Sequence, residues 1–337
     1  MNSRISGRNR KFFWALLLAG VLVSLPMFGE CWAQKDAYPS RPITLLTGWA
    51  AGGGTSLVLS IITPLAERQL KQQIVISTKE GGSGAISLTT LKRAKPDGYT
   101  IGITTSAINV HKFLGTLDFG YEAFEPFIAL NSDPGGINVK IDAPWKNLKE
   151  FIEHARKNPE KVSVAGSNPG SVTRLELHRL EQAAGVLFNV ISFKGAAGPG
   201  VTSLAGGHVD AAIATPLESK ALREAGKVRM LGVMSEERMP HESQIPTCKE
   251  QGFDVVMATH RVLLAPKGTP PAILKILHEA FKKAAESKEY DNFVKSQASL
   301  KMYLTAEQTK EFLAKQDVLF KEVIEKAGLK LEKGKKK

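Results

Sequence analysis

Cysteine is scarce in this chain of 337 residues, which contains only Cys31 and Cys248. Cys31 lies in a segment with the features of an export signal. Cys248 is therefore expected to be the single cysteine of the mature chain, where no internal disulfide can form. A lone cysteine of this kind is predicted to be a small buried hydrophobic residue. The seven histidines are scattered. No cysteine and histidine group has metal-ligand spacing, so neither a metal nor another cofactor is predicted.

A second long apolar run is also missing from the sequence. Four basic residues precede an apolar stretch at 12–25, and Cys31-Trp32-Ala33 resembles a small-x-small cleavage site. This pattern predicts a cleavable signal peptide over residues 1–33, with an uncleaved N-terminal anchor as the alternative. Cleavage would leave about 300 residues, which is large for one hydrophobic core, so two lobes are predicted.

The formal net charge is +12, but the basic residues are dispersed along the chain. No interleaved aromatic platform and no zinc module accompanies them, so nucleic acid is not a predicted partner. The lysine-rich segment 330–337 is expected to be a solvated end of the chain. A dispersed positive balance favours attraction of small anionic solutes.

Segments with strand and helix character alternate along the chain, which predicts parallel sheets with helices on both faces. The expected strands are 43–47, 74–77, 99–104, 136–141, 162–165, 189–193, 209–214, 230–234, 255–257 and 262–265. The expected helices are 55–70, 85–93, 148–157, 172–184, 200–205, 216–225, 247–251, 271–286, 288–296 and 306–326. No Pro/Gly/Ser-rich linker separates two folds, so the lobes are expected to be joined by crossing strands, with the ligand cleft between them.

A glycine-rich turn between the first strand and the first helix is the most informative motif. Residues 48–56 read Gly-Trp-Ala-Ala-Gly-Gly-Gly-Thr-Ser. Glycines let the backbone approach a ligand, and the following helix start offers free N–H groups, so the turn is predicted to hold an anion. A nucleotide is disfavoured because Gly54 stands where a P-loop has lysine. The glycines at 81–84 lack the third glycine of a dinucleotide fingerprint and indicate either a structural turn or a ligand contact.

A second strand, polar turn and helix start, at 165–174, forms a candidate anion site in which Ser171 is the expected N-cap. Arg174 is either a carboxylate clamp or a surface residue. A hydrolase is the competing class of function, yet no Gly-x-Ser-x-Gly elbow surrounds Ser83, Ser167 or Ser171. A Ser-His-Asp triad built from residues far apart in the sequence stays open.

Taken in order, several segments resemble the Bug family, the extracytoplasmic solute receptors of tripartite tricarboxylate transporters. The similarity covers almost all of the expected mature chain, and the order of the segments is more specific than any single one. The segments are 38–44, 50–55, 95–100, 106–109, 193–195, 204–210, 225–229, 245–247 and 264–271.

The resemblance implies an α/β fold of the two-lobed periplasmic binding protein type II kind. Each lobe would be a mostly parallel sheet flanked by helices, with residues 34–138 and 262–337 in lobe 1 and residues 139–261 in lobe 2. Loops from both lobes would hold a ligand carboxylate through main-chain groups and water. The implied ligand-binding residues are Trp49, Ala51, Gly52, Gly53, Gly54, Thr55, Ser56, Thr105, Ser106, Asn109, Ser167, Gly170, Ser171, Arg174, Lys194, Gly195, Gly198, Thr215 and His260.

The resemblance further implies a periplasmic receptor without catalytic residues, and a monomer is expected. Such a receptor captures a small organic carboxylate by lobe closure and passes it to the membrane permease subunits of a tripartite transporter. A periplasmic hydrolase, or a sensing receptor without a permease, are the alternatives. Ser56 stands where relatives commonly have aspartate, Arg174 where histidine is frequent and His260 where tryptophan is frequent. These departures predict extra positive character and a dicarboxylate or aromatic carboxylate ligand.

Overall fold

The structure, a computed structural model, describes residues 38–50, 52–166, 171–193 and 197–329. Residues 39–337 form one compact unit, which contains every described helix and strand. The predicted signal peptide lies outside the described residues. No helix in the described ranges is both long enough and apolar enough to span a membrane.

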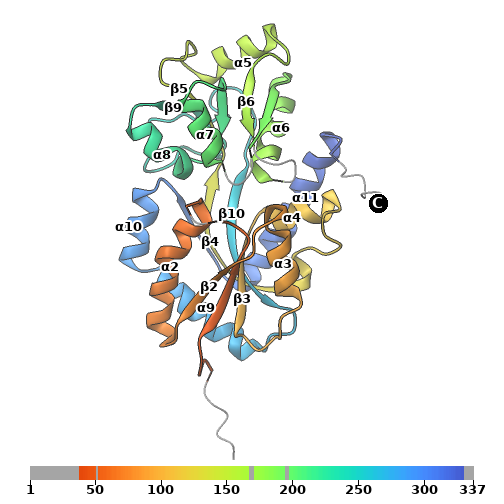
Figure 1. The fold of residues 1–337 in the computed structure, drawn as a ribbon, viewed down its shortest axis with the longest axis vertical. Coiled ribbons are helices and arrows are strands. Elements are labelled where there is room, and N and C mark those ends of the chain that lie inside the picture. Colours follow the sequence, from red (N-terminus) through yellow and green to blue (C-terminus); the bar gives the residue numbers. More distant parts are fainter. Residues whose placement is uncertain (1–37, 51, 167–170, 194–196, 330–337) are drawn as a thin grey trace, which may run out of the picture. The chain divides into compact units, whose positions relative to one another are not determined.

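The first sheet has six strands, in the order β11-β4-β10-β3-β1-β2 (Figure 1). Strand β1 pairs in parallel with β2 and β3, whereas β10 runs antiparallel to β3 and β4, and β11 antiparallel to β4. The strands are β1 (Ile43–Thr47), β2 (Ile74–Thr78), β3 (Thr100–Thr105), β4 (Phe124–Pro134), β10 (Ala258–Pro266) and β11 (Leu300–Leu304).

The second sheet has five strands, in the order β7-β6-β8-β5-β9. Strand β6 is parallel to β7 and β8, and β5 is antiparallel to β8 and β9. The strands are β5 (Gly136–Lys140), β6 (Ser163–Gly166), β7 (Asn189–Ser192), β8 (Ala211–Ile213) and β9 (Val228–Val233).

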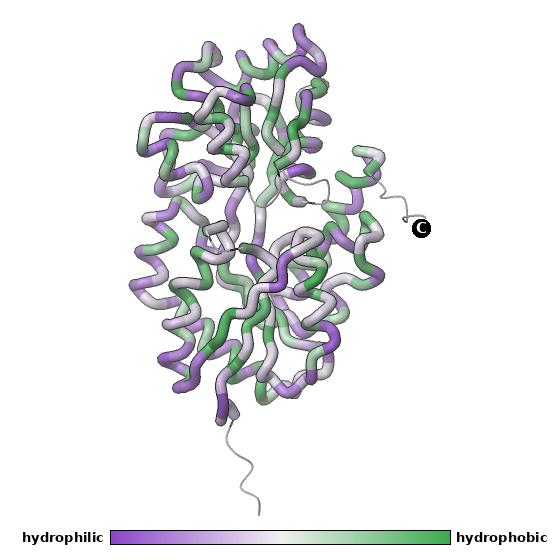
Figure 2. Tube along the Cα trace, in the orientation of Figure 1, coloured by the Kyte–Doolittle hydropathy of each residue, from purple (hydrophilic) through white to green (hydrophobic). Residues whose placement is uncertain are grey.

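Helices pack on both sheets, and the apolar residues gather on the strands and on the helix faces that cover them (Figure 2). The helices that contact the first sheet or each other there are α2 (Gly54–Leu70), α3 (Ala85–Lys92), α4 (Ala107–Leu114), α9 (Pro271–Ala285), α10 (Lys288–Ser296) and α11 (Ala306–Lys326). Those of the second sheet are α5 (Leu148–Lys157), α6 (Val172–Ala184), α7 (Gly198–Ala205) and α8 (Pro216–Glu224).

The predicted α/β class is confirmed, but both sheets are mixed rather than mostly parallel. The difference arises because β4, β5 and β10 carry the chain between the sheets and lie antiparallel to their neighbours. The sequence prediction also missed β4, β11 and α4.

The predictions of a helix at 247–251 and of a strand at 255–257 are wrong. Thr247 and Glu250 do make the reciprocal hydrogen bonds of a capping box, with Glu250 N–H donating to Thr247 Oγ1 at 3.0 Å and Thr247 N–H to Glu250 Oε2 at 2.8 Å. No helix follows, because Gly252 adopts a φ of 93° and redirects the chain directly after these hydrogen bonds. Residues 255–257 form no strand, and β10 begins only at Ala258.

The chain changes sheets at Gly135 and again between Met257 and Ala258. Gly135 N–H donates to Met257 O at 3.2 Å, Met257 N–H to Met234 O at 3.0 Å, and Met234 N–H to Gly135 O at 2.8 Å. These three backbone hydrogen bonds tie the crossing segments together. The lobe boundaries at 138 and 261 stay a prediction, while the strands themselves exchange sheets three or four residues earlier in each case.

Cys248 is fully buried, as expected of a small core residue, and burial raises the pKa of its thiol to about 12. Because only the thiolate reacts with alkylating reagents, alkylation of native Cys248 at pH 8 should be about a thousandfold slower than that of an ordinary thiol. Mass spectrometry of the Cys248 peptide after iodoacetamide treatment, with and without urea, measures this. Equal labelling in both conditions would contradict the buried position.

Candidate functional site

The glycine-rich turn ends at a helix start that has no side-chain cap. Gly53 is the N-cap of α2 with extended backbone angles. The first intrahelical hydrogen bond is donated by Leu57 N–H to Gly53 O at 3.1 Å, so the N–H groups of Gly54, Thr55 and Ser56 precede the helical ladder. Ser56 Oγ also donates to Gly53 O, at 2.8 Å, rather than accepting from these N–H groups. No side-chain cap therefore neutralises the positive end of this 17-residue helix.

A second glycine segment holds this turn in place. A Cβ on Gly48 would lie 2.5 Å from Gly84 Cα, so the two backbones approach as closely as only glycines permit. The Trp49 ring packs on Gly84 as well, about where a side chain would project. His111 Nε2 is 3.0 Å from Ser83 O and fixes the same segment from α4. Of the two interpretations of residues 81–84, the structural turn is the one that these contacts support.

The predicted residues of β3 and α4 are buried in contacts within the protein. Ser106 Oγ donates to Ala258 O at 3.1 Å and accepts from His260 N–H at 2.9 Å, which joins the start of α4 to β10. Asn109 is completely buried and its Nδ2 donates to Leu313 O at 2.9 Å. The structure thus brings Ser106 and His260 together and turns Asn109 toward α11.

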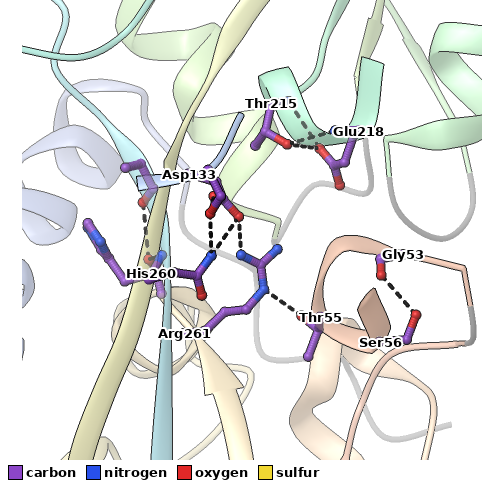
Figure 3. A network of polar contacts seen from close by, with 12 residues as sticks. Gly53, Thr55, Ser56, Asp133, Thr215, Glu218, His260 and Arg261 are labelled. Atoms are coloured by element: carbon purple, nitrogen blue, oxygen red, sulfur yellow. Dashed lines mark hydrogen bonds and ion pairs between the residues drawn. The ribbon is translucent and has the colours of Figure 1, made fainter. Parts of the chain in front are cut away.

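The charged centre of this region is Arg261, which the sequence prediction missed. Its side chain is 3% exposed and pairs with Asp133, whose side chain is fully buried (Figure 3). Arg261 Nε also donates to Thr55 Oγ1 at 3.2 Å. Asp133 accepts further hydrogen bonds from Asn131 Nδ2 at 3.0 Å and from Ser299 Oγ. The one hint in the sequence is a basic residue directly before the apolar run 262–265 of β10.

Helix α8 packs on the second sheet, and its start lies against the start of α2. Thr215 caps α8 in a capping box, and its Oγ1 donates to Glu218 Oε2 at 3.0 Å. Burial raises the pKa of Glu218, while the hydrogen bonds from Thr215 and the positive charge of Arg261 oppose that rise. A Cβ on Gly54 would come within 3.2 Å of Leu217. Elements of both sheets therefore meet around the predicted residues Gly54, Thr55 and Thr215.

A second residue absent from the sequence prediction is Glu176 of α6. It is 1% exposed, and its Oε1 has no hydrogen-bond partner among the described residues. The carboxyl group lies over Gly135, where a Cβ would be 2.7 Å from its Cδ. Burial, reinforced by the negative charges of Glu218 and Asp133, raises the pKa of Glu176 well above its ordinary value. This environment disfavours the charged form of the carboxyl at the sheet crossing.

At the start of α6 the predicted N-cap is confirmed, because Ser171 Oγ accepts from Arg174 N–H at 3.2 Å. The side chain of Arg174 donates from Nε to His178 Nε2 at 3.2 Å, and His178 Nδ1 lies 2.8 Å from Glu181 Oε2. Arg174 lines a cavity of about 670 Å³ with residues of α5, α6 and β7 and with Phe188, which directly precedes β7. It is thus part of a chain of polar contacts along α6.

Of the remaining predicted site residues, Gly198 begins α7 without a side-chain cap, and Gly52 has a φ of 88°. Five others lie outside the described residues, and their placement stays a prediction: Ala51, Ser167, Gly170, Lys194 and Gly195.

The extra positive character expected from His260 is wrong. Burial and the charge of Arg261 lower the pKa of His260 to about 3, so the ring is neutral at pH 7. Its ring packs edge-on against Phe312 at a centroid distance of 4.5 Å and lines a cavity of about 220 Å³ beside the sheet crossing. Positive charge near the glycine turn is supplied by Arg261 and by the start of α2 instead. Among the described residues, no group of three or more His, Cys, Asp or Glu could hold a metal ion.

Comparison with known proteins places these features in a family. Residues 60–329 match the tripartite tricarboxylate transporter family receptor. The chain is 27% identical to the protein BugT of Bordetella pertussis over 89% of this chain and 93% of that protein.

Two solved structures share the fold over nearly their whole length. A TctC solute-binding protein from Polaromonas, solved without ligand, is 33% identical with a TM-score of 0.71, covering 86% of this chain and 99% of that one. An adipate-bound protein from R. palustris is 26% identical with a TM-score of 0.81, covering 86% and 98%. The resemblance to the Bug family is thereby confirmed, and the chain belongs to the family of tripartite tricarboxylate transporter receptors.

Proposed function

We propose that this chain is a periplasmic receptor that captures a small dicarboxylate at the start of α2 and delivers it to the permease subunits of a tripartite transporter. The uncapped first turn of α2, at Gly53–Ser56, is the observation that carries the proposal. Its free N–H groups and the helix dipole favour a carboxylate without any charged side chain in direct contact. The adipate bound to the R. palustris relative supports the ligand class.

Closure is the proposed mechanism of capture. The starts of α2 and α8 approach each other at Gly54 and Leu217. A ligand that contacts both sides binds the closed arrangement better than an open one, and this difference in affinity shifts the population toward closure. A permease that recognises the closed form would then accept only loaded receptors.

A hydrolase is the less favoured alternative. Within the described ranges no histidine ring is hydrogen-bonded to a serine hydroxyl. His111 contacts a carbonyl oxygen, His178 contacts Arg174 and Glu181, and His278 contacts Phe127 O and Tyr303. A triad requires a serine hydroxyl in contact with a histidine base. The described geometry therefore favours binding over catalysis.

Isothermal titration with adipate tests the proposed function, with the neutral diamide of the same chain length as the matched control. We expect saturable binding of adipate and none of adipamide, because an amide carries no anionic charge for the helix dipole. At a ligand concentration of 100 times the dissociation constant, bound adipate should raise the free energy of unfolding by about 2.7 kcal/mol. A thermal shift assay would detect this as a higher melting temperature. Binding of adipamide but not of any dicarboxylate would disprove the proposal.

A sensing receptor would give the same titration, so uptake separates the two roles. Deleting this receptor is expected to abolish uptake of labelled dicarboxylate through its permease, whereas a sensor would leave uptake intact.

A further inference from the structure

We propose that Arg261 is the positioning residue for the ligand-binding turn of α2, and that Asp133 holds Arg261 in the orientation this requires. The inference rests on the proposed function, since it assigns the residue that aligns the N–H groups expected to bind the carboxylate. Arg261 would not touch the ligand itself. It would orient the N–H groups of the first turn of α2 from the side opposite the ligand.

The contacts of the guanidinium define this role. On one side its Nη1 pairs with Asp133, and on the other its Nε donates to Thr55 Oγ1 at 3.2 Å (Figure 3). Thr55 is the second residue of α2, so its side chain reports directly on the orientation of the uncapped turn. A planar guanidinium offers donors in fixed directions and can hold two partners at once, which a lysine ammonium on its flexible stem does less well.

Asp133 is itself immobilised from two strands and the segment before β11. It accepts from Asn131 Nδ2 at 3.0 Å and from Ser299 Oγ, and it is fully buried. Charge-assisted hydrogen bonds of this kind are stronger and more directional than neutral ones. The turn of α2 is thereby anchored, through Arg261, to the strands β4 and β10 that carry the chain between the sheets.

Gly54 supplies the space that this arrangement needs. Any Cβ at position 54 would collide with Nη2 of Arg261 and would also press on Leu217 of α8. The guanidinium therefore packs directly under the backbone of the turn. The positive charge of Arg261 also acts on Glu218 in α8, so the same side chain interacts with an element of each sheet.

Three variants test the inference. Thr55→Val removes the hydroxyl that accepts from Nε. Arg261→Lys keeps the charge without the fork, and the double variant Asp133→Asn with Arg261→Gln removes both buried charges together. Arg68→Gln, at an exposed arginine of the same helix that pairs with Glu289, is the matched control. The readouts are adipate affinity by titration, urea unfolding, and hydrogen exchange of the peptide that covers residues 54–60.

Adipate affinity should fall about tenfold in Thr55→Val, as expected for loss of one hydrogen bond to a charged group. It should fall at least as far in Arg261→Lys and in the double variant, while Arg68→Gln binds like wild type. In the double variant the unfolding midpoint should stay near that of wild type, because no buried charge is left unpaired. If the ion pair served stability alone, the double variant, which is as stable as wild type, should also bind adipate as tightly as wild type. That result would overturn the inference.

Hydrogen exchange in the unliganded chain keeps the inference separate from the proposed function. The 54–60 peptide should exchange faster in all three variants than in wild type. Its exchange rate should be unchanged in Arg68→Gln. If wild type fails to bind dicarboxylates, the proposed function fails, but faster exchange would still show that Arg261 orders the turn. If exchange and affinity are both unaltered in Arg261→Lys and in Thr55→Val, the positioning role is wrong.

Discussion

An Asp133→Ala chain should unfold more easily than wild type by about 3–5 kcal/mol, the largest loss expected from any single change at the candidate site. The substitution leaves the guanidinium of Arg261, 3% exposed, without its counter-charge. It also removes the acceptor for Asn131 and Ser299, which are themselves completely or almost completely buried. Buried donors that lose their partner pay the cost of dehydration without compensation.

Urea unfolding at pH 7, followed by circular dichroism, measures this loss. Asp142→Ala is the matched control, because Asp142 pairs with Lys140 at 3.1 Å on the surface and its side chain is 67% exposed. Exposed pairs of this type contribute less than about 1 kcal/mol. Similar unfolding midpoints for the two variants would show that the Asp133–Arg261 pair is not buried in solution as described.

Local rules explain which parts of this molecule were predictable from sequence. The glycine-rich turn, the capping serine at position 171 and the helix start after Pro270 each depend on residues within one turn of each other. Such features are encoded by backbone freedom and by side-chain-to-backbone hydrogen bonds. The alternation of strands and helices gave the fold class for the same reason.

The contacts missed by the prediction all join distant parts of the chain. Arg261 meets Asp133 across 128 positions and Thr55 across 206. No periodicity in either segment marks these pairings, because the register between β4 and β10 is set by tertiary packing. The prediction for His260 failed similarly: its charge depends on burial and on a neighbouring arginine, neither of which is visible in sequence.

Glu176→Gln should stabilise the protein at neutral and alkaline pH. In the wild type the Glu176 carboxyl is 1% exposed, and burial together with Glu218 and Asp133 raises its pKa well above 4.5. Arg261 lies in the same region but is already paired with Asp133. Ionising Glu176 inside the fold is therefore costly, and glutamine has the same shape without that cost.

The sign of the pH dependence follows from proton counting. Because burial raises the pKa of Glu176 in the folded chain, the folded chain keeps this proton over a pH range in which the unfolded chain has lost it. Stability must then fall as pH rises, by up to about 1.4 kcal/mol per pH unit, until the folded-state pKa is passed. The stabilising contribution of the protonated form is complete below the unfolded-state pKa of about 4.5 and is lost as the pH rises through the folded-state pKa.

Urea unfolding of wild type and Glu176→Gln between pH 5 and pH 8 isolates this contribution, since all other titrating groups are common to both chains. The two should be closest in stability at pH 5, and the advantage of the glutamine variant should grow as the pH rises toward the folded-state pKa of Glu176. The same change at Glu153, an exposed residue of α5, should leave the pH profile of wild type unaltered. A constant difference between wild type and Glu176→Gln over this range would mean that the carboxyl is ionised in the fold. Its unpartnered Oε1 would then need a cationic or hydrogen-bonding partner that the described residues do not provide.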